Sequence, residues 1–513
     1  MEISFFKKRK AYKRQINNEM PDEGANPEKG TFFSGDLQND IPHINQLYSY
    51  PENIDFVLRE FTIQTIGKKA ALFYIPSLTD EQLIDGGIIK PLITKDKDIL
   101  DVPSSISVTA VREEKEVEKA IKDLNTGDTL LMVEGQTHAY IIKTAKVAGR
   151  SVEKPQNETT LLGPKESFNE KAEVNISLIR KRIRNEDFIV EKMTIGGRSN
   201  NEVFIIYNKE LASEKVLGEV KGRIRSIKKD AVQNLSLLIQ HIEDRKISLV
   251  PTILQTERPD RAASFIEDGH VIVIMNNSPF ALVTPATFWS FYHTADDHYL
   301  RFIYGNVTRF LRIIAMFITL FTPSIYIAIT NYHMEMLPTD LLLAIAGARE
   351  MVPFPAILEL LLLELAFELI REAGLRVPTP IGPTIGIVGA LILGQAAVEA
   401  NVVSPIVVII VALTGLSSFA ISDVHFNYMV RTVRFGFLLA AGLFGIFGMI
   451  GCFMVCLIYL TTLKSFGVPY LAPLTPNYKS SGDTIFRKIL TNERLRPEFT
   501  KTKDLSKDTI RTK

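Results

Sequence analysis

The stretch that decides the fold is residues 435–460, which read FGFLLAAGLFGIFGMIGCFMVCLIYL and contain no charged side chain. Three further uncharged apolar runs of at least 18 residues precede it, at 313–330, 381–398 and 402–421. A helix of about 20 apolar residues is long enough to cross the hydrocarbon layer of a bilayer, which is roughly 30 Å thick. A soluble core would rarely repeat such a run four times. We therefore expect residues 301–465 to form an α-helical membrane domain with roughly four to six spans.

Basic residues occur in pairs beside these runs, where alternate membrane ends should lie. Because Lys and Arg favour the cytoplasmic end of a membrane helix, this pattern predicts a cytoplasmic amino-terminal region. The pairs are Arg309 and Arg312, Arg371 and Arg376, and Arg431 and Arg434. The side of the polar basic tail, 466–513, stays open. A single last crossing would place it outside, whereas the positive-inside bias would keep it inside.

The residues before the first apolar run have a different composition. Residues 1–50 combine the basic cluster KKRKAYKR at 7–14 with Asn, Pro, Gly and Asp, and show neither helical nor strand periodicity. We expect a mobile arm, whose basic cluster either contacts anionic lipid or is simply solvated. No apolar stretch follows the cluster, as a signal peptide would require, so export of this half is not expected.

The 59 basic and 58 acidic residues of the whole chain balance, which disfavours a nucleic-acid-binding protein.

Residues 51–300 alternate short strand-like runs with amphipathic helical stretches, which is typical of compact α/β units. One pattern occurs twice. GDTLLMVEGQTHAYII at 127–142 and GHVIVIMNNSPFALV at 269–283 share the order glycine, apolar strand, polar turn, second strand, and each predicts a β-hairpin. The strand-to-helix passages upstream also correspond. We expect a duplicated soluble α/β subdomain, at 51–165 and 166–300, although unrelated hairpins could produce the same pattern.

The segment 341–371 is apolar yet carries charges, which makes it the candidate functional segment. A charge at the bilayer centre costs about 2.5–3.5 kcal/mol on insertion scales, so these groups need a partner or water. Glu364, Glu368 and Glu372 follow each other at four-residue spacing and share one helix stripe, whereas Glu359 points elsewhere. Several such helices around an axis would form acidic rings that attract cations. The candidate pore or gate residues are Pro353, Phe354, Pro355, Glu359, Glu364 and Glu368.

Two alternatives remain for this segment. It could be an amphipathic helix lying against the soluble region, with Arg349, Arg371 or Arg376 neutralising its carboxylates. The prolines remove backbone donors and disfavour helix just before them, so residues 349–354 are expected to form a bend or hinge, or else simply the start of a helix.

Small residues predict close helix packing in the apolar runs. Because lipid supplies no hydrophobic drive between helices, packing must supply the attraction, and glycine or alanine at four-residue spacing lets helices approach. The helix-packing residues of the second run are Gly382, Gly386, Ala390 and Gly394. The last run is thinned in the same way by Gly442, Gly445, Gly448 and Gly451. Cys452 and Cys456 in that run are expected to be reduced packing residues.

Catalytic patterns are absent from the sequence. Gly196-Gly197 and Gly86-Gly87 lack the lysine and hydroxyl context of a phosphate loop, and no nucleophile elbow occurs. The residues His293, Asp296, Asp297 and His298 have no metal-ligand spacing and are read as a solvated juxtamembrane loop. We expect no enzyme activity, no cofactor and no metal site.

Five longer runs carry a family resemblance. The runs are TERPDR at 256–261, NSPFALVTP at 277–285, REMVPFP at 349–355, REAGLRVPTPIGPTIGIVGALILGQAAVEANVVSP at 371–405 and FGVPYLAP at 466–473. On these runs the chain resembles the A subunit of the GerA-type spore germinant receptors of endospore-forming bacteria over about residues 65–476. The fourth run is long and highly specific.

The resemblance implies a nutrient-sensing complex in the spore inner membrane, with the amino-terminal region on the spore-core side. Its expected partners are a transporter-like B subunit, a lipoprotein C subunit and further copies of the A subunit. In that family the A subunits are thought to pass cations when triggered, which would make the segment after Pro353 a gated path. Two alternatives are a non-conducting scaffold and the related family member found with the dipicolinate-release machinery. A third, a secondary transporter, predicts inverted repeats, and none is evident.

Overall fold

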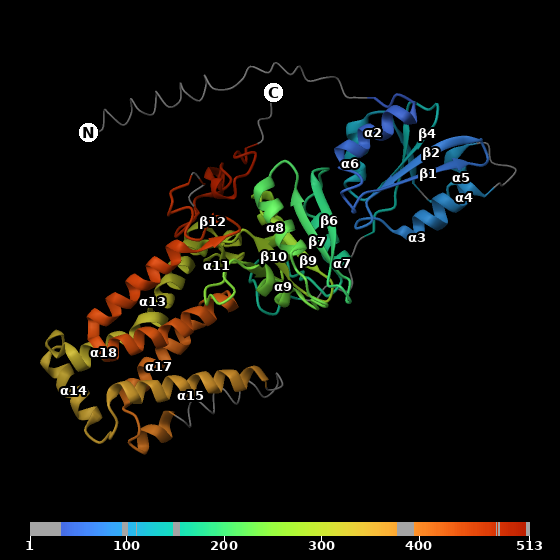
Figure 1. Cartoon of the computed structure of the whole chain (residues 1–513). Coiled ribbons are helices and arrows are strands. Elements are labelled where there is room, and N and C mark those ends of the chain that lie inside the picture. Colours follow the sequence, from blue (N-terminus) through green and yellow to red (C-terminus); the bar gives the residue numbers. More distant parts are fainter. Residues whose placement is uncertain are drawn as a thin grey trace, which may run out of the picture. The chain divides into compact units, whose positions relative to one another are not determined.

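The computed structural model describes residues 32–94, 101–108, 110–146, 154–376, 394–478, 480 and 483–508 (Figure 1). The chain divides into two compact units, the second of which begins at Lys146 and also takes in Gln46–Phe56 and Pro76–Leu78. The basic cluster at 7–14 lies outside the described residues. Helix α2 (Leu37–Leu47) falls within the expected irregular arm, so that expectation is wrong for these residues. Leu37 and Ile44 are seven residues apart and buried, as one helix face requires.

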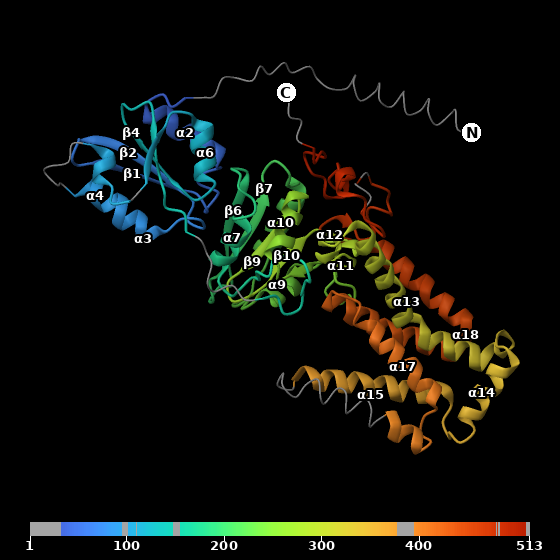
Figure 2. The same ribbon diagram turned by 180° about the vertical axis from the view of Figure 1, so that it is seen from behind.

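The first unit is a five-stranded antiparallel sheet with helices on both faces (Figures 1 and 2). The strands lie in the order β1 (Val57–Ile63), β2 (Lys68–Tyr74), β4 (Thr129–Val133), β5 (Ala139–Ile142) and β3 (Val111–Glu114). One face packs against α3 (Glu81–Ile84), the π-helical turn Asp85–Ile89, α4 (Lys90–Ile93) and α5 (Val102–Ser105). Helices α2 and α6 (Val117–Leu124) cover the other face.

The second unit contains a second five-stranded antiparallel sheet. Its strands lie in the order β6 (Phe188–Ile195), β7 (Asn201–Asn208), β9 (Val271–Met275), β10 (Ala281–Thr284) and β8 (Leu254–Thr256). One face packs against α7 (Ala172–Arg180) and α10 (Pro259–Glu267), and the other against α8 (Glu214–Arg225) and α9 (Leu235–Ile242).

The two sheets have the same topology. If the five strands of each sheet are numbered along the chain, both sheets have the spatial order 1-2-4-5-3. The hairpins predicted at 127–142 and 269–283 are β4–β5 and β9–β10, which occupy equivalent places. The α/β class and its duplication are therefore confirmed. The second unit begins at Lys146 instead of at 166, and the backbone N–H groups of Asn157 and Glu158 donate to the carboxylate of Glu257, beside the second sheet.

The helical half follows the second sheet. Helices α11 (Phe288–Tyr292) and α12 (Asp296–Tyr299) lead into α13 (Phe302–Tyr332). The later helices are α14 (Thr339–Arg349), α15 (Ala356–Arg376), α17 (Pro405–Ser418) and α18 (Val424–Thr462). Among the described residues, α13 and α18 are long and apolar enough to cross a membrane, while α17 is a shorter apolar helix. The expectation of four to six spans stays a prediction. Most of the run 381–398 lies outside the described residues, including Gly382, Gly386 and Ala390.

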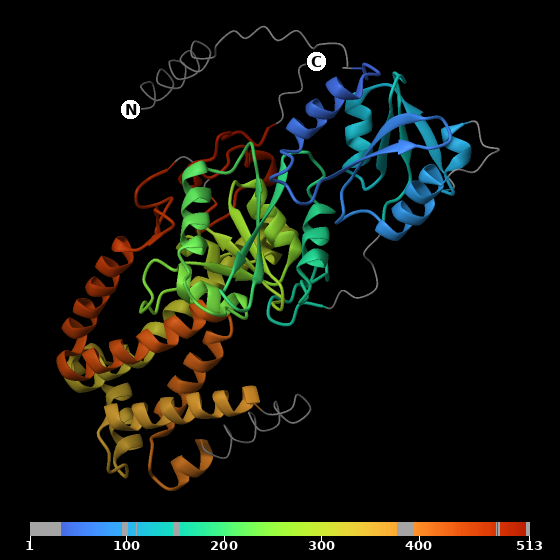
Figure 3. The ribbon, with the colours of Figure 1, turned by 45° about the vertical axis from the view of Figure 1, so that its right-hand side comes forward.

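Helix α18 is bent into two limbs at Gly445, whose φ of 59° and ψ of −141° interrupt the helix. The hydroxyl of Tyr332, at the end of α13, donates to the carbonyl oxygen of Gly442 at 2.7 Å beside this bend. Phe426 near the start of α18 and Leu463 just after its end belong to the same apolar core as the second sheet. The second limb, 446–462, thus returns the chain to the side where the first limb, 424–444, began (Figure 3). The sequence had left open whether this run makes a single last crossing, and the bend at Gly445 shows that the helix is not one straight span.

The carboxyl-terminal tail packs against the second sheet's subdomain. It begins with a small hairpin of β11 (Lys464–Ser465) and β12 (Val468–Pro469), followed by fully buried Tyr470. Further along, Nε of Arg496 donates to the carbonyl oxygen of Glu267 at 2.8 Å. Two 3₁₀ turns, Leu490–Asn492 and Glu498–Thr500, lie in this tail. The side of the tail, left open by the sequence, is therefore the side of the second sheet.

The two limbs of α18 approach each other closely at Gly448. A Cβ atom at that position would overlap the backbone carbonyl of Ala440, and no side-chain rotation can relieve such a clash, whereas Gly451 has open space around it. We expect Gly448→Ala to cost about 1–3 kcal/mol as an overpacked contact. Gly451→Ala, in the same limb, should be neutral or slightly stabilising because alanine favours helix. Thermal unfolding of the purified chain in detergent measures both, and equal shifts would contradict the close approach.

Candidate functional site

Helix α15 runs antiparallel to the first limb of α18, and this arrangement brings its carboxylates to arginines. Near its start, Ile357 covers Gly442. Two turns and three turns later, Glu364 and Glu368 meet Arg434 and Arg431. As the residue numbers in α15 increase, those of their partners in α18 decrease, as expected for antiparallel helices. Helix α17 lies beside α15, in contact with it and with α13.

The interior charge cluster consists of Glu364, Glu368, Arg431 and Arg434. Nη2 of Arg434 lies 2.7 Å from Oε2 of Glu364 and 3.1 Å from Oε1 of Glu368. Nε of Arg431 donates to the same Oε1 of Glu368 at 3.0 Å, and its Nη2 reaches the other oxygen. Glu364 and Arg434 are each about 1% exposed. Arg434 lies ten residues into the first limb, or roughly 15 Å at the usual helical rise, so the cluster lies deep in the helical half.

Glu359 lies apart from this cluster. It is fully buried, and its carboxylate accepts a hydrogen bond from Nε of Arg349 at 3.2 Å and another from the backbone N–H of Ser404 at 3.0 Å. It therefore joins the end of α14 to the start of α17. The structure brings Glu364 and Glu368 together and leaves Glu359 at a separate site.

The proline segment is an exposed bend between α14 and α15. Pro353, Phe354 and Pro355 are all exposed. Helix α15 starts directly after Pro355, whose carbonyl oxygen accepts hydrogen bonds from the backbone N–H groups of Leu358 and Glu359. None of these three residues belongs to the interior charge cluster. The bend is an uncharged junction between α14 and α15.

Of the three arginines that the sequence suggested as partners for these carboxylates, Arg349 pairs with Glu359, whereas Arg371 and Arg376 have partners outside the interior charge cluster. Arg376 pairs with Glu372 on an exposed surface of α15. Arg371 donates to Oγ of Ser418 at 2.9 Å and lies over the ring of Phe419. Arg431 and Arg434 were read only as topology markers before the run at 435. The one available signal was their three-residue spacing, which places both on one helix face.

Several buried polar atoms in the helical half have no hydrogen-bond partner among the described residues. They include Oε1 of Glu364, Nε of Arg434, Nε of Arg371, the hydroxyl of Ser324 and Oδ1 of Asn427. Burying such groups costs free energy unless water or another chain satisfies them. The interior of this half is therefore polar enough to hold water, although its carboxylates are neutralised by arginine.

A second buried network lies at the amino-terminal end of α13, which we call its foot. We call it the base cluster, and it consists of Asp297, Arg309, Arg312 and Asp483. Asp297 is fully buried, 3.0 Å from Nε of Arg309 and 3.1 Å from Nη2 of Arg312. Burial alone would raise the pKa of Asp297, but hydrogen bonds and charge from Arg312 and Arg309 outweigh it and lower the pKa to about 2. The expectation of a solvated loop at this position is wrong.

The motif TERPDR connects the second sheet to this cluster. Its Arg261 donates to the carbonyl oxygens of Ser290 at 2.7 Å and His293 at 2.9 Å, in the chain that leads into α12. Arg258, 1% exposed, pairs with Asp260 at 2.8 Å. Arg261 thus connects α10 to the chain segment that precedes α12.

Comparison with known sequences places these features in a family context. A profile for the family described as Bacillus/Clostridium GerA spore germination protein matches residues 43–499. Spore germination protein KA of Bacillus subtilis (strain 168) is 38% identical over 460 residues, which are 88% of this chain and 84% of that protein. Spore germination protein A1 of the same organism is 38% identical over 424 residues, 82% of this chain and 88% of that protein.

One solved structure is also similar. It is the crystal structure of the N-terminal domain of the A subunit of the Bacillus megaterium spore germinant receptor GerK3. The match has 25% sequence identity and a TM-score of 0.40, and covers 51% of this chain and 99% of that one.

Proposed function

We propose, since this chain belongs to the Bacillus/Clostridium GerA family of spore germination proteins, that it is the A subunit of a nutrient germinant receptor and forms the cation-conducting part of that receptor. The observation that carries the proposal is the interior charge cluster in the helical half. The buried pair of Glu364 with Arg434, and the partly exposed Glu368 and Arg431 beside it, are costly to keep in an apolar bundle, which favours a functional reason for retaining them.

In the closed state, Arg434 and Arg431 neutralise Glu364 and Glu368. Opening would separate these pairs, expose the carboxylates to water and let them attract cations. The exposed bend at 353–355 supplies a place where α15 can shift relative to α14. The partnerless polar atoms nearby would contact water in the open path.

The complex that we propose contains several copies of this chain together with a transporter-like B subunit and a lipoprotein C subunit. The helices α13 and α18 would cross the spore inner membrane, and the two sheets and the tail would lie on the spore-core side. The base cluster and Arg261 would carry a nutrient-induced movement of the sheets to α13.

A second candidate is a non-conducting scaffold that assembles the other subunits. The observation that favours it is the pairing of Glu359, Glu364 and Glu368 with an arginine each. Carboxylates neutralised in this way do not attract cations. The scaffold keeps its pairs intact at all times, whereas the gate must break them.

Spores that retain this receptor alone test the proposed function. Deletion of the chain should abolish both germination and monovalent-cation release in response to amino acids, sugars and nucleosides, and wild-type chain should restore them. Restoration with Glu364→Gln plus Glu368→Gln should change the rate or selectivity of cation release at equal receptor level. Full nutrient responses without the chain would contradict a receptor role, and unchanged release from the double variant would favour the scaffold.

A further inference from the structure

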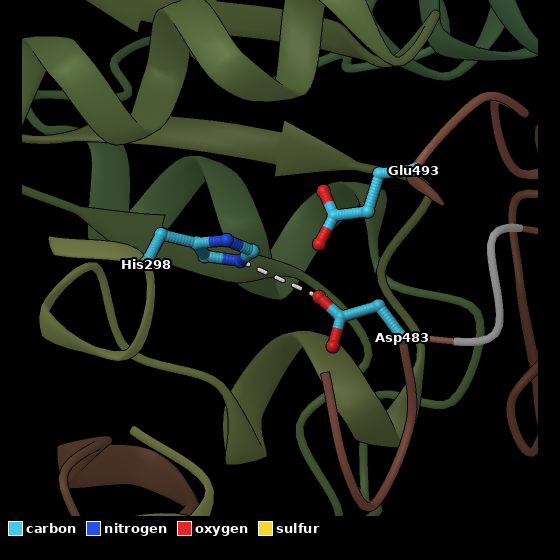
Figure 4. A group of neighbouring side chains, drawn as sticks. All are labelled: His298, Asp483 and Glu493. Carbon is cyan, nitrogen blue, oxygen red and sulfur yellow. Dashed lines mark ion pairs between the residues drawn. The ribbon is translucent and has the colours of Figure 1, made fainter. Parts of the chain in front are cut away.

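We propose that His298, Asp483 and Glu493 bind a divalent transition-metal ion at the foot of the helical half. One ligand atom from each of these side chains lies within 4.8 Å of the other two. Figure 4 shows the imidazole of His298 and the carboxylates of Asp483 and Glu493 converging on one point. Nε2 of His298 is 3.4 Å from Oδ2 of Asp483, an interval that a metal ion between them would bridge with little movement.

The fold assembles this set from distant parts of the chain. His298 lies in α12, four residues before α13 begins, whereas Asp483 and Glu493 lie in the carboxyl-terminal tail. Sequence spacing therefore could not reveal it. An ion held here would fasten the tail to the entrance of α13.

The other contacts of Asp483 engage mainly one of its two oxygens. Arg309 binds Oδ1 of Asp483 through Nη1, whereas its Nη2 reaches Oδ2 only at 3.4 Å, and Oδ2 faces His298. Arg309 is itself paired with Asp297, so its positive charge is shared between two carboxylates. Such hydrogen bonds from neighbouring side chains hold metal-ligating carboxylates in position.

One carboxylate oxygen of Glu493 has no hydrogen-bond donor among the described residues. That oxygen, Oε1, is buried. A carboxylate oxygen buried beside a second carboxylate needs positive charge nearby, and Arg487 and Lys507 supply some, but neither donates a hydrogen bond to Oε1. A divalent ion would supply that charge.

An independent observation comes from the cavity beside these residues. It has a volume of about 360 Å³ and is lined by all three proposed ligands and by His270. His270 is 2% exposed, and its Nδ1 lies 3.1 Å from the carbonyl oxygen of Phe265, which can only accept. In the neutral ring Nε2 is then an unprotonated acceptor, yet no described residue contacts it with a hydrogen bond. A polar ligand or water in this cavity would satisfy that nitrogen.

The donor set indicates which ions fit. One imidazole and two carboxylates suit Zn²⁺ or Mn²⁺, whereas Mg²⁺ and Ca²⁺ prefer all-oxygen ligands. Three protein ligands leave open positions for water, which the cavity can hold. The inference goes beyond the proposed function and does not depend on it, because the site would bind metal in a channel or in a scaffold alike.

The test uses the purified full-length chain in detergent after removal of metal with a chelator. Isothermal titration with Mn²⁺ and with Zn²⁺ should show one high-affinity ion per chain. Glu493→Gln and His298→Ala should each weaken binding at least about tenfold, since loss of a supporting partner alone costs 10–100-fold. His43→Ala, at an exposed histidine of α2, is the matched control and should bind as wild type does.

Limited proteolysis gives a second readout. Metal should slow cleavage within residues 483–508 of the wild-type chain, and this protection should be lost in Glu493→Gln. Size-exclusion profiles identify any variant that fails to fold, in which case the conservative Glu493→Gln carries the test. Binding by neither ion, or equal affinity and equal tail protection in wild type and Glu493→Gln, would overturn the proposal.

Discussion

Replacing Arg434 with methionine is expected to cost about 3–5 kcal/mol of folding free energy, the range observed when one partner of a buried ion pair is removed. Arg434 lies between Glu364 and Glu368 and is 1% exposed. Without it, Glu368 keeps Arg431, but Glu364 loses the cation nearest to its carboxylate. The yield of monodisperse protein and its unfolding in mixed micelles measure the loss.

The matched control is Arg376→Met. Arg376 pairs with Glu372 on the same helix that carries Glu364, but its side chain is 80% exposed. An exposed pair contributes less than about 1 kcal/mol, so this change should be nearly silent. Adding Glu364→Met to Arg434→Met should recover much of the loss, because no uncompensated charge remains. Equal losses from Arg434→Met and Arg376→Met would contradict the buried pairing.

Asp297→Asn is expected to have the second largest effect, again about 3–5 kcal/mol, because it leaves Arg312 without its carboxylate and Arg309 with Asp483 alone. The foot of α13 and the tail should loosen together, and protease cleavage within 483–508 should accelerate. Asp296→Asn is the neighbouring control. Its carboxylate accepts from the backbone N–H of Leu161 at 3.1 Å, which an amide oxygen can replace.

The same carboxylate predicts a pH dependence. The pKa of Asp297 is lowered from 3.8 to about 2, so the unfolded chain takes up this proton at a higher pH than the folded chain does. Its contribution to stability is present above pH 3.8 and is lost as the pH falls towards 2. Thermal unfolding of wild type should therefore lose stability over this window more steeply than Asp297→Asn does. Identical slopes would show that the carboxylate is not ion-paired.

The features that the sequence predicted well are local ones. Each β-hairpin is encoded within about fifteen residues by a glycine, a continuous apolar strand and a polar turn, and the duplication follows because that pattern repeats. The four-residue stripe of Glu364 and Glu368 was also readable from helical geometry alone.

The features that it missed depend on contacts between distant residues. Glu364 and Arg434 are seventy positions apart, and nothing in either neighbourhood identifies the other. The bend at Gly445 was hidden because a glycine that packs a helix and one that adopts a positive φ look alike in sequence. Asp297 looked solvated because its partners Arg309 and Arg312 lie in the following helix, and Asp483, which shares Arg309, lies in the carboxyl-terminal tail.

The most direct test of a gated path through the interior charge cluster is the monovalent-cation current of the receptor in a planar bilayer. This chain is reconstituted with its B and C subunits, and current is recorded before and after nutrient addition. We predict a nutrient-dependent current whose cation selectivity falls in Glu368→Gln and is unchanged in Glu372→Gln, a carboxylate of the same helix that is 57% exposed. No nutrient-dependent current, or equal selectivity in both variants, would contradict the account.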